Sequence, residues 1–143
     1  ILRCLVGSEM CIETEKELRV YEAAVKDIVD ITFDAYDRSD IIKASRVEPL
    51  EEVIDRLNDE IKKKHIKRLR KGKCTIELGF VLSDLTTNFE RVADHCSNIA
   101  VCLIQTQADG YEMHEYLDKL KEDEDPFFGQ MFEEYCKEYR LPS

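Results

Sequence analysis

Apolar residues recur at alternating steps of four and three through residues 78–103. At 3.6 residues per turn, this spacing places them in one stripe along a long helix. The stripe comprises Leu78, Leu82, Leu85, Phe89, Val92, Cys96, Ile99 and Leu103. The pattern predicts a helix with Thr75 as its N-cap and its end near Thr106. A charge at Val92 should then unfold the domain, because it would enter the stripe without a partner.

The same periodicity occurs in two earlier segments, about residues 13–40 and 45–71. Short connections between long helices indicate antiparallel neighbours. With only 5 Gly and 3 Pro, the 143-residue chain has few of the turn residues that a β-rich fold needs. We therefore expect an all-α fold whose core is an antiparallel three-helix bundle over about residues 12–107.

The boundaries of the second helix carry local signals. Ser45 and Glu48 have the S-x-x-E spacing of a capping box, although Pro49 suits the first helical turn and would move the start there. Gly72 is placed to end the helix. The sequence leaves the two possible starting points open.

Two shorter helices should follow the bundle. Residues 111–121 carry apolar positions at helical spacing, and Pro126 suits the first turn of a last helix. We expect these two helices to form a C-terminal hairpin over residues 111–141. The whole chain, residues 1–143, is then a single domain.

Charge is distributed unevenly. The formal net charge of −10 disfavours nucleic acid as a partner. Yet residues 62–73 contain eight basic residues in twelve. The favoured interpretation is that these cations complement a helix C-terminus, and the alternative is a docking strip for anionic lipid or phosphate. No apolar run approaches the ~18 residues of a membrane-spanning helix.

Paired carboxylates are the candidate chemistry. Glu90 and Asp94 lie one turn apart and away from the apolar stripe, and Glu51 and Asp55 repeat the spacing on the preceding helix. If the two helices are adjacent, the pairs approach each other, and four carboxylates suit hard cations or iron. Acidic residues on a solvated helix face are, however, the default in such a composition.

Other polar residues carry less information. Asp30 and Asp34 form a third pair without distinctive neighbours, and His65 falls toward an apolar face, as a core histidine does. No nucleophile triad, nucleotide-binding loop or zinc motif occurs. The sequence therefore favours a non-catalytic protein.

Residues 89–100, FERVADHCSNIA, resemble the signature E-R-(I/V)-G-D-H-x-x-N-I-A of PhoU proteins. Residues 51–57 resemble the partner motif on the preceding helix. The longer stretch 50–105 is similar to a PhoU-like domain at the cytoplasmic C-terminus of bacterial Na⁺/phosphate symporters. The resemblance implies a regulatory, non-catalytic domain of a sodium-dependent phosphate transporter, on the cytoplasmic side of the membrane. The implied partner is the membrane portion of that transporter or another phosphate-uptake protein.

The resemblance also implies a divalent metal or a multinuclear cluster of iron, zinc or magnesium. Its ligands would be Glu51, Asp55, Glu90 and Asp94. Two other functions stay open: a free-standing PhoU-type regulator of phosphate uptake and, less favoured, a di-metal phosphohydrolase.

Two features depart from the family pattern. PhoU proteins carry two such repeats, whereas this chain has room for one plus the hairpin, so a homodimer is expected to supply the second. Ala93 stands where the family usually has Gly, which should widen the helix packing slightly.

Overall fold

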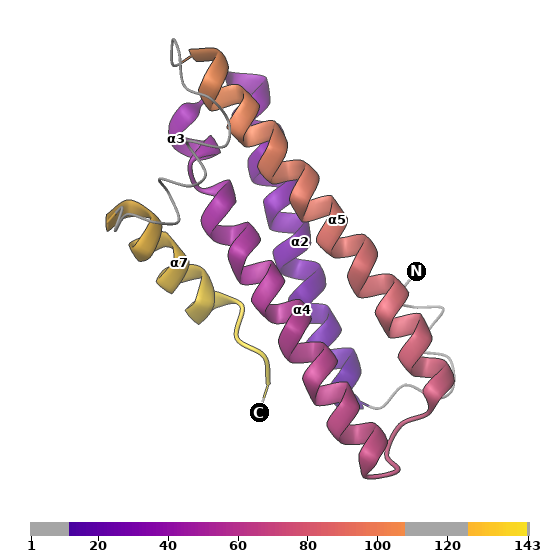
Figure 1. The fold of residues 1–143 in the computed structure, drawn as a ribbon. Coiled ribbons are helices and arrows are strands. Elements are labelled where there is room, and N and C mark those ends of the chain that lie inside the picture. Colours follow the sequence, from indigo (N-terminus) through magenta and orange to yellow (C-terminus); the bar gives the residue numbers. More distant parts are fainter. Residues whose placement is uncertain (1–11, 108–125, 143) are drawn as a thin grey trace.

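The computed structural model describes residues 12–107 and 126–142, and every regular element in these ranges is an α-helix. Figure 1 shows their arrangement. The elements are α2 (Ile12–Arg38), α3 (Ile41–Ala44), α4 (Val47–Arg70), α5 (Ile76–Gln107) and α7 (Pro126–Glu138). The all-α prediction is confirmed.

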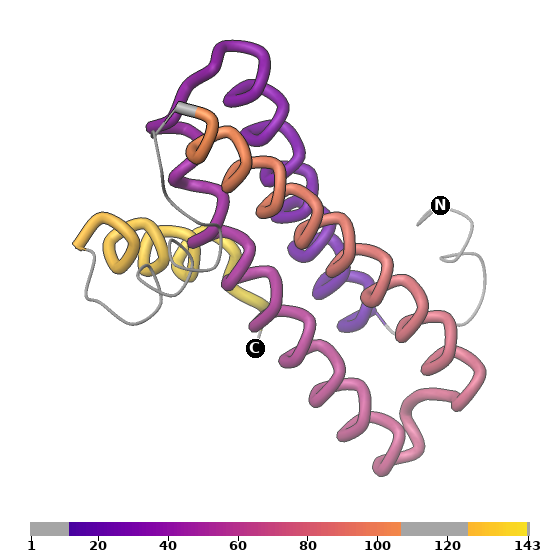
Figure 2. Tube along the Cα trace, turned by 45° about the horizontal axis from the view of Figure 1, so that its top comes forward, coloured from indigo at the N-terminus to yellow at the C-terminus, as the bar shows by residue number. Residues whose placement is uncertain are grey.

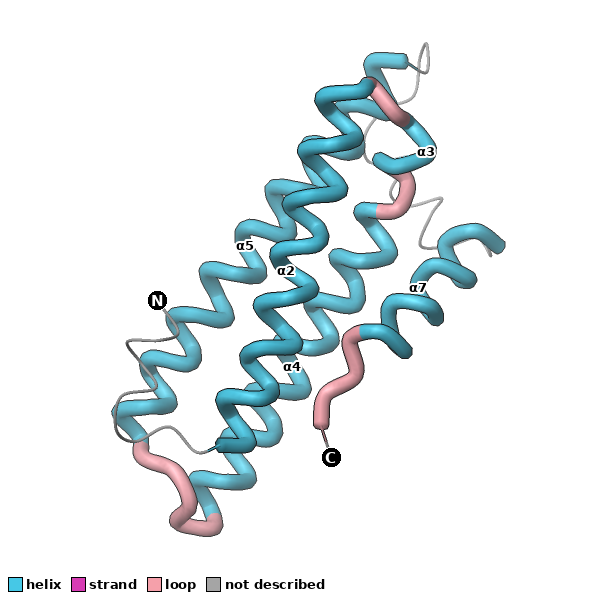
Figure 3. The backbone as a smooth tube through the Cα atoms, turned by 180° about the vertical axis from the view of Figure 1, so that it is seen from behind, coloured by secondary structure: helices cyan, strands magenta, loops and turns pink. Residues whose placement is uncertain are grey.

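The long helices α2, α4 and α5 pack against one another, and α4 runs antiparallel to both of the others (Figure 2). The short helix α3 joins α2 to α4 at one end of the bundle. Helix α7 packs on α4, on the side away from α5 (Figure 3). The antiparallel three-helix bundle is thus as predicted. The last helix of the chain, α7, begins at Pro126 as expected. The other helix of the expected hairpin, 111–121, lies outside the described residues.

Two helix ends follow their sequence signals. Gly72 has φ +65°, the left-handed conformation typical of a residue just after a helix, and its amide donates to the carbonyl of Leu69 at 3.0 Å. Thr75 accepts a hydrogen bond from the amide of Leu78 at 3.3 Å through its side-chain oxygen. The α4–α5 connection is therefore fixed by local chemistry.

The start of α4 differs from the capping-box prediction. The Ser45 hydroxyl donates to the carbonyl of Ile42 at 2.9 Å, and α4 begins at Val47 without a side-chain cap. The capping residue lies earlier, because Asp40 accepts from the amide of Lys43 and starts α3. The capping chemistry of this connection belongs to α3.

The core lies where the three long helices meet. Its largest fully buried apolar side chains come from all three helices: Leu18, Tyr21, Ile28, Val47, Leu50, Ile54, Ile61 and Val101. Spacings of three and four on α2 and α4 explain this set, because such residues share one face.

Most of the predicted stripe on α5 is packed as expected: Leu82 and Cys96 are buried, and Leu85, Phe89 and Leu103 lie against the core. The helix is nevertheless rotated slightly relative to this stripe. Val92 and Ile99 are 39% and 45% exposed, whereas the neighbouring Ala93 and Ala100 are buried. Small side chains let α5 approach the other helices closely, so the bulky residues beside them move outward. The predicted burial of Val92 and Ile99 is wrong. Because Val92 is partly exposed, burial of an unpaired charge is no longer a reason to expect that a charge at this position unfolds the domain.

This rotation can be tested by enlarging two neighbouring residues. Ala93→Leu is expected to lower the free energy of unfolding by about 1–3 kcal/mol, because the added methyl groups have no space in a packed interface. Val92→Leu should change it by less than ~0.5 kcal/mol. Urea unfolding followed by circular dichroism measures both variants. Equal effects would favour the stripe predicted from the sequence.

Candidate functional site

A line of polar residues follows the contact between α4 and α5. On α4 they recur at steps of three and four: Glu48, Glu51, Asp55, Asn58 and Lys62. On α5 they run in the opposite order along the helix: Ser97, Asp94 and Glu90. We call these eight residues the polar seam. Antiparallel packing brings the two rows together, because equal spacing on both helices keeps them in register.

Three carboxylates meet in the middle of the polar seam. One oxygen from each of Glu51, Asp55 and Asp94 lies within 4.8 Å of the other two. Glu51 is buried, Asp55 is half-buried and Asp94 is exposed. The group therefore has a buried floor and a side open to solvent, through which an ion can enter.

The remaining contacts of the seam flank this group. On one side the Ser97 hydroxyl donates to the carboxylate of Glu48. On the other, the Asn58 amide donates to the carboxylate of Glu90, and the Lys62 ammonium lies 3.8 Å from the same carboxylate. The structure thus brings together three of the four predicted ligands, while the carboxylate of Glu90 is held by Asn58 and Lys62.

Two residues that sequence reasoning missed belong to this region. Asn58 is buried, and its side-chain carbonyl oxygen has no hydrogen-bond partner among the described residues. Tyr21, from α2, is buried and donates to the carbonyl of Thr86 at 3.3 Å. Burial raises the pKa of Tyr21, and so do the negative charges of Glu90, Asp55 and Asp94. For Asn58, the signal available in the sequence was its spacing of three residues from Asp55, which places both side chains on one face of α4.

The arrangement suits a hard cation. Carboxylate and amide oxygens are the ligands that Mg²⁺, Ca²⁺ and Mn²⁺ prefer, and carboxylates also bind iron. Three carboxylates this close repel one another, and a bound cation would relieve that repulsion. The residues present therefore fit a metal ion.

Asp34, one member of the third acidic pair, has a structural role. Asp34 forms ion pairs with Arg38 at 2.9 Å and with Lys43. The hydrogen bond from Lys43 holds the pKa of Asp34 below its usual range, helped by Arg38. Because Lys43 lies on α3 and Asp34 lies on α2, their ion pair holds the two helices together.

His65 is a core histidine, as its position on α4 predicted. It is buried, and its Nδ1 lies 3.6 Å from the sulfur of Cys74. Burial lowers the pKa of His65, and the charge of Arg68 lowers it further. A Cβ on Gly79 would lie 3.0 Å from its Nε2, so Gly79 leaves the space that the ring occupies.

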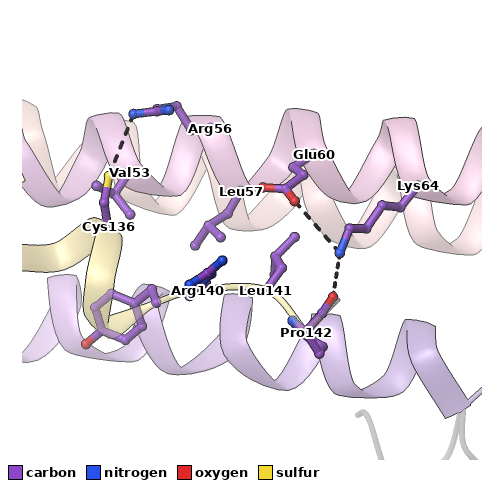
Figure 4. Close-up of a pocket in the computed structure, with 10 residues that line it drawn as sticks. Val53, Arg56, Leu57, Glu60, Lys64, Cys136, Arg140, Leu141 and Pro142 are labelled. Carbon is purple, nitrogen blue, oxygen red and sulfur yellow. Dashed lines mark hydrogen bonds and ion pairs between the residues drawn. The ribbon is translucent and has the colours of Figure 1, made fainter. Parts of the chain in front are cut away.

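A cavity of about 650 Å³ lies on the other side of α4, against the C-terminal segment (Figure 4). The Lys64 ammonium crosses it, donating to the carbonyl of Pro142 at 2.6 Å and pairing with Glu60 at 3.8 Å. Arg56 reaches the sulfur of Cys136 at 3.7 Å and lies over the ring of Phe132. These contacts anchor α7 and the segment after it, and the three clustered carboxylates lie elsewhere.

The PhoU domain family matches residues 18–103, more than half of the 143 residues and all of the polar seam. The chain belongs to the PhoU domain family. The PhoU family is a regulatory, non-enzymatic family.

A curated relative of this PhoU domain is the phosphate-specific transport system accessory protein PhoU homolog 1 of Thermotoga maritima. It is 31% identical over 117 residues, which cover 80% of this chain and 50% of the relative. The chain thus spans about half the length of that protein. No solved structure matches the chain significantly. No helix within residues 12–107 and 126–142 is long and apolar enough to cross a membrane.

Proposed function

We propose that this chain is the regulatory, non-catalytic PhoU domain of a sodium-dependent phosphate transporter. It would lie on the cytoplasmic side of the membrane and contact the membrane portion of the same transporter. The resemblance of residues 50–105 to the cytoplasmic domains of such symporters supports this proposal, and the family match over residues 18–103 supports a role in phosphate uptake.

One observation carries the proposed mechanism: acidic motifs from two helices meet in a group of three carboxylates. A divalent metal, or a cluster of iron, zinc or magnesium, would be held by Glu51, Asp55 and Asp94, with Asn58 and Glu90 beside them. With a cation bound, the repulsion between the acids of α4 and α5 would be neutralised, and these carboxylates would hold the two helices together. The occupancy of this group would then set how firmly the two helices are held, which is a signal that a partner can sense.

A second copy of the chain is a further proposed partner. A homodimer would bring two three-helix bundles together, which is the number of repeats that the resemblance to PhoU proteins implies. Sedimentation equilibrium of the purified chain measures this directly.

The test of function is phosphate uptake by cells that carry the complete gene, with and without sodium. The double variant Glu51→Gln/Asp94→Asn is expected to change sodium-dependent uptake of radiolabelled phosphate, because it removes ligands from both helices. Asp59→Asn, at an exposed position of α4, is the matched control and should leave uptake unchanged. If the double variant and the control are both indistinguishable from the wild type, the acids do not regulate transport.

A free-standing PhoU-type adaptor is the second candidate. It is favoured because the relative is named as an accessory protein of a phosphate-specific transport system. In that case the acid variants would alter phosphate uptake that is independent of sodium. A di-metal phosphohydrolase predicts something else: metal-dependent phosphate release from a phosphomonoester, lost in Asp94→Asn. These readouts separate the three functions.

A further inference from the structure

The end of the bundle where α4 turns into α5 combines clustered cations with exposed apolar side chains. Residues 62–73 contain eight basic residues in twelve. At the same end Ile66, Ile76 and Phe80 are 48%, 67% and 70% exposed. The first turns of α2 lie at this end too (Figure 1). We call this region, formed by residues 12–17, 62–75 and 76–81, the basic tip.

A pocket of about 550 Å³ opens within the basic tip, between the start of α2 and the end of α4. Six cations and two acids line it: Lys16, Lys64, Lys67, Arg68, Lys71, Lys73, Glu13 and Glu17. Glu17 is neutralised, because Arg68 donates to both of its oxygens at 2.8 and 2.6 Å and Lys64 lies 3.7 Å away. The positive charge of the other lysines therefore dominates the opening of the pocket.

Complementing a helix terminus accounts for only part of this arrangement. Cations favour the last turn of a helix, which covers Lys67, Arg68 and Arg70 on α4. Lys16 lies instead on the first turns of α2, and Lys73 lies in the connection after α4. A cation at the N-terminal end of a helix does not complement the helix dipole, so this role does not explain Lys16. The convergence of cations from three segments on one pocket indicates an anionic ligand.

The exposed apolar residues of the basic tip indicate which kind of anionic ligand fits it. A free phosphate ion would be bound by the pocket alone and would leave Ile76 and Phe80 in water. A lipid surface offers phosphate groups beside an apolar layer, and it accepts lysines and apolar side chains together. We propose that the basic tip docks on an anionic lipid surface, with its lysines at the headgroup phosphates and Ile76 and Phe80 in the acyl boundary.

The net charge of −10 does not oppose this docking. Helix α5 has 32 residues and is about 48 Å long at ~1.5 Å per residue. Salt screens charges beyond about 10 Å at ~0.1 M ionic strength, so acids at the far end of the bundle have little effect on the basic tip. The local charge decides the interaction.

The test is co-sedimentation of the chain with vesicles of equimolar phosphatidylcholine and phosphatidylglycerol, with pure phosphatidylcholine as the reference. Each lysine near an anionic surface contributes about fivefold in partitioning, so Lys67→Gln/Lys71→Gln should reduce vesicle binding about 30-fold. Phe80→Ser should reduce it roughly tenfold, because the ring no longer enters the interface. Added salt should weaken wild-type binding.

Matched controls lie away from the basic tip. Lys26→Gln/Lys137→Gln removes two exposed lysines, and Phe33→Ser removes a ring that is 73% exposed, close to the exposure of Phe80. Both control variants should bind vesicles as the wild type does. Circular dichroism of every variant checks that the fold is kept.

Three outcomes would overturn the proposal: no preference for the anionic vesicles, equal losses in the controls, or calorimetric binding of inorganic phosphate at the pocket without vesicle binding. The last would assign the pocket to a soluble anion. The inference goes beyond the proposed function and uses none of the polar seam. Vesicle binding can therefore fail while the acid variants still alter phosphate uptake.

Discussion

Arg68→Met is expected to lower the free energy of unfolding by roughly 3 kcal/mol, because removing one member of a buried ion pair leaves the other buried. The side chains of Glu17 and Arg68 are only 3% and 12% exposed and share two hydrogen bonds. Lys64, 3.7 Å from Glu17, offsets part of the loss. Urea unfolding monitored by circular dichroism gives the value.

Two further variants decide whether the cost comes from a stranded charge. In the double variant Glu17→Leu/Arg68→Met most of the stability should return, because two apolar residues of similar volume replace the pair. The control is Arg19→Met, which breaks an Arg–Glu pair of 2.6 Å whose arginine is 63% exposed. It should cost less than ~1 kcal/mol. A double variant that is no more stable than Arg68→Met would contradict this explanation.

Asp94→Asn and Glu51→Gln are expected to weaken metal binding by more than the roughly 10–100-fold that loss of an outer-shell partner costs. Both carboxylates belong to the group within 4.8 Å, and each variant removes one of three anionic ligands. Calorimetric titration with Mg²⁺, Mn²⁺, Zn²⁺ or Fe²⁺ measures the affinity. Elemental analysis of protein purified without a chelator identifies the bound metal.

In the absence of metal, Asp94→Asn is not expected to weaken the protein, and its effect on stability should be opposite in sign to its effect on metal binding. Without a cation, Asp94→Asn removes one of three repelling charges and should leave the stability unchanged or slightly higher. With saturating metal, the wild type should gain about 2.7 kcal/mol at ~100 times the dissociation constant, and the variant should gain much less. If no cation binds the wild type, or if Asp59→Asn loses as much affinity, the metal proposal fails.

The variant Glu90→Gln tests whether Glu90 is a metal ligand, as the family motif implies, or lies outside the ligand set, as its contacts in the structure indicate. The resemblance implies Glu90 as a fourth ligand, whereas the structure holds its carboxylate with Asn58 and Lys62. We therefore expect a smaller loss of metal affinity in Glu90→Gln than in Asp94→Asn. Equal losses would indicate that binding a cation draws Glu90 away from Asn58.

The sequence predicted the helices well because their limits are local. Gly72 and Thr75 set the α4–α5 connection through backbone conformation and one capping bond, as expected. The start of α4 was missed because the capping residue of this connection, Asp40, belongs to α3. That helix is too short to show a hydrophobic period in the sequence. Four helical residues carry no repeating pattern to detect.

The rotation of α5 could not be predicted from its own residues. Two neighbouring apolar rows run along this helix, and its periodicity does not say which row meets the other helices. The answer depends on α4, whose acidic row meets Asp94 and whose Asn58 meets Glu90. The approach of the two acid motifs was predicted, but the burial of Ala93 and the contacts of Glu90 needed the neighbouring helix.

Helix α4 packs against α2, α3, α5 and α7. It carries Glu51 and Asp55 toward α5, and on its other side it receives α7. A helix moves as a stiff body, so a sideways push on α7 shifts both carboxylates together. A displacement of α7 would therefore reach Glu51 and Asp55, which we propose as metal ligands, through the body of α4.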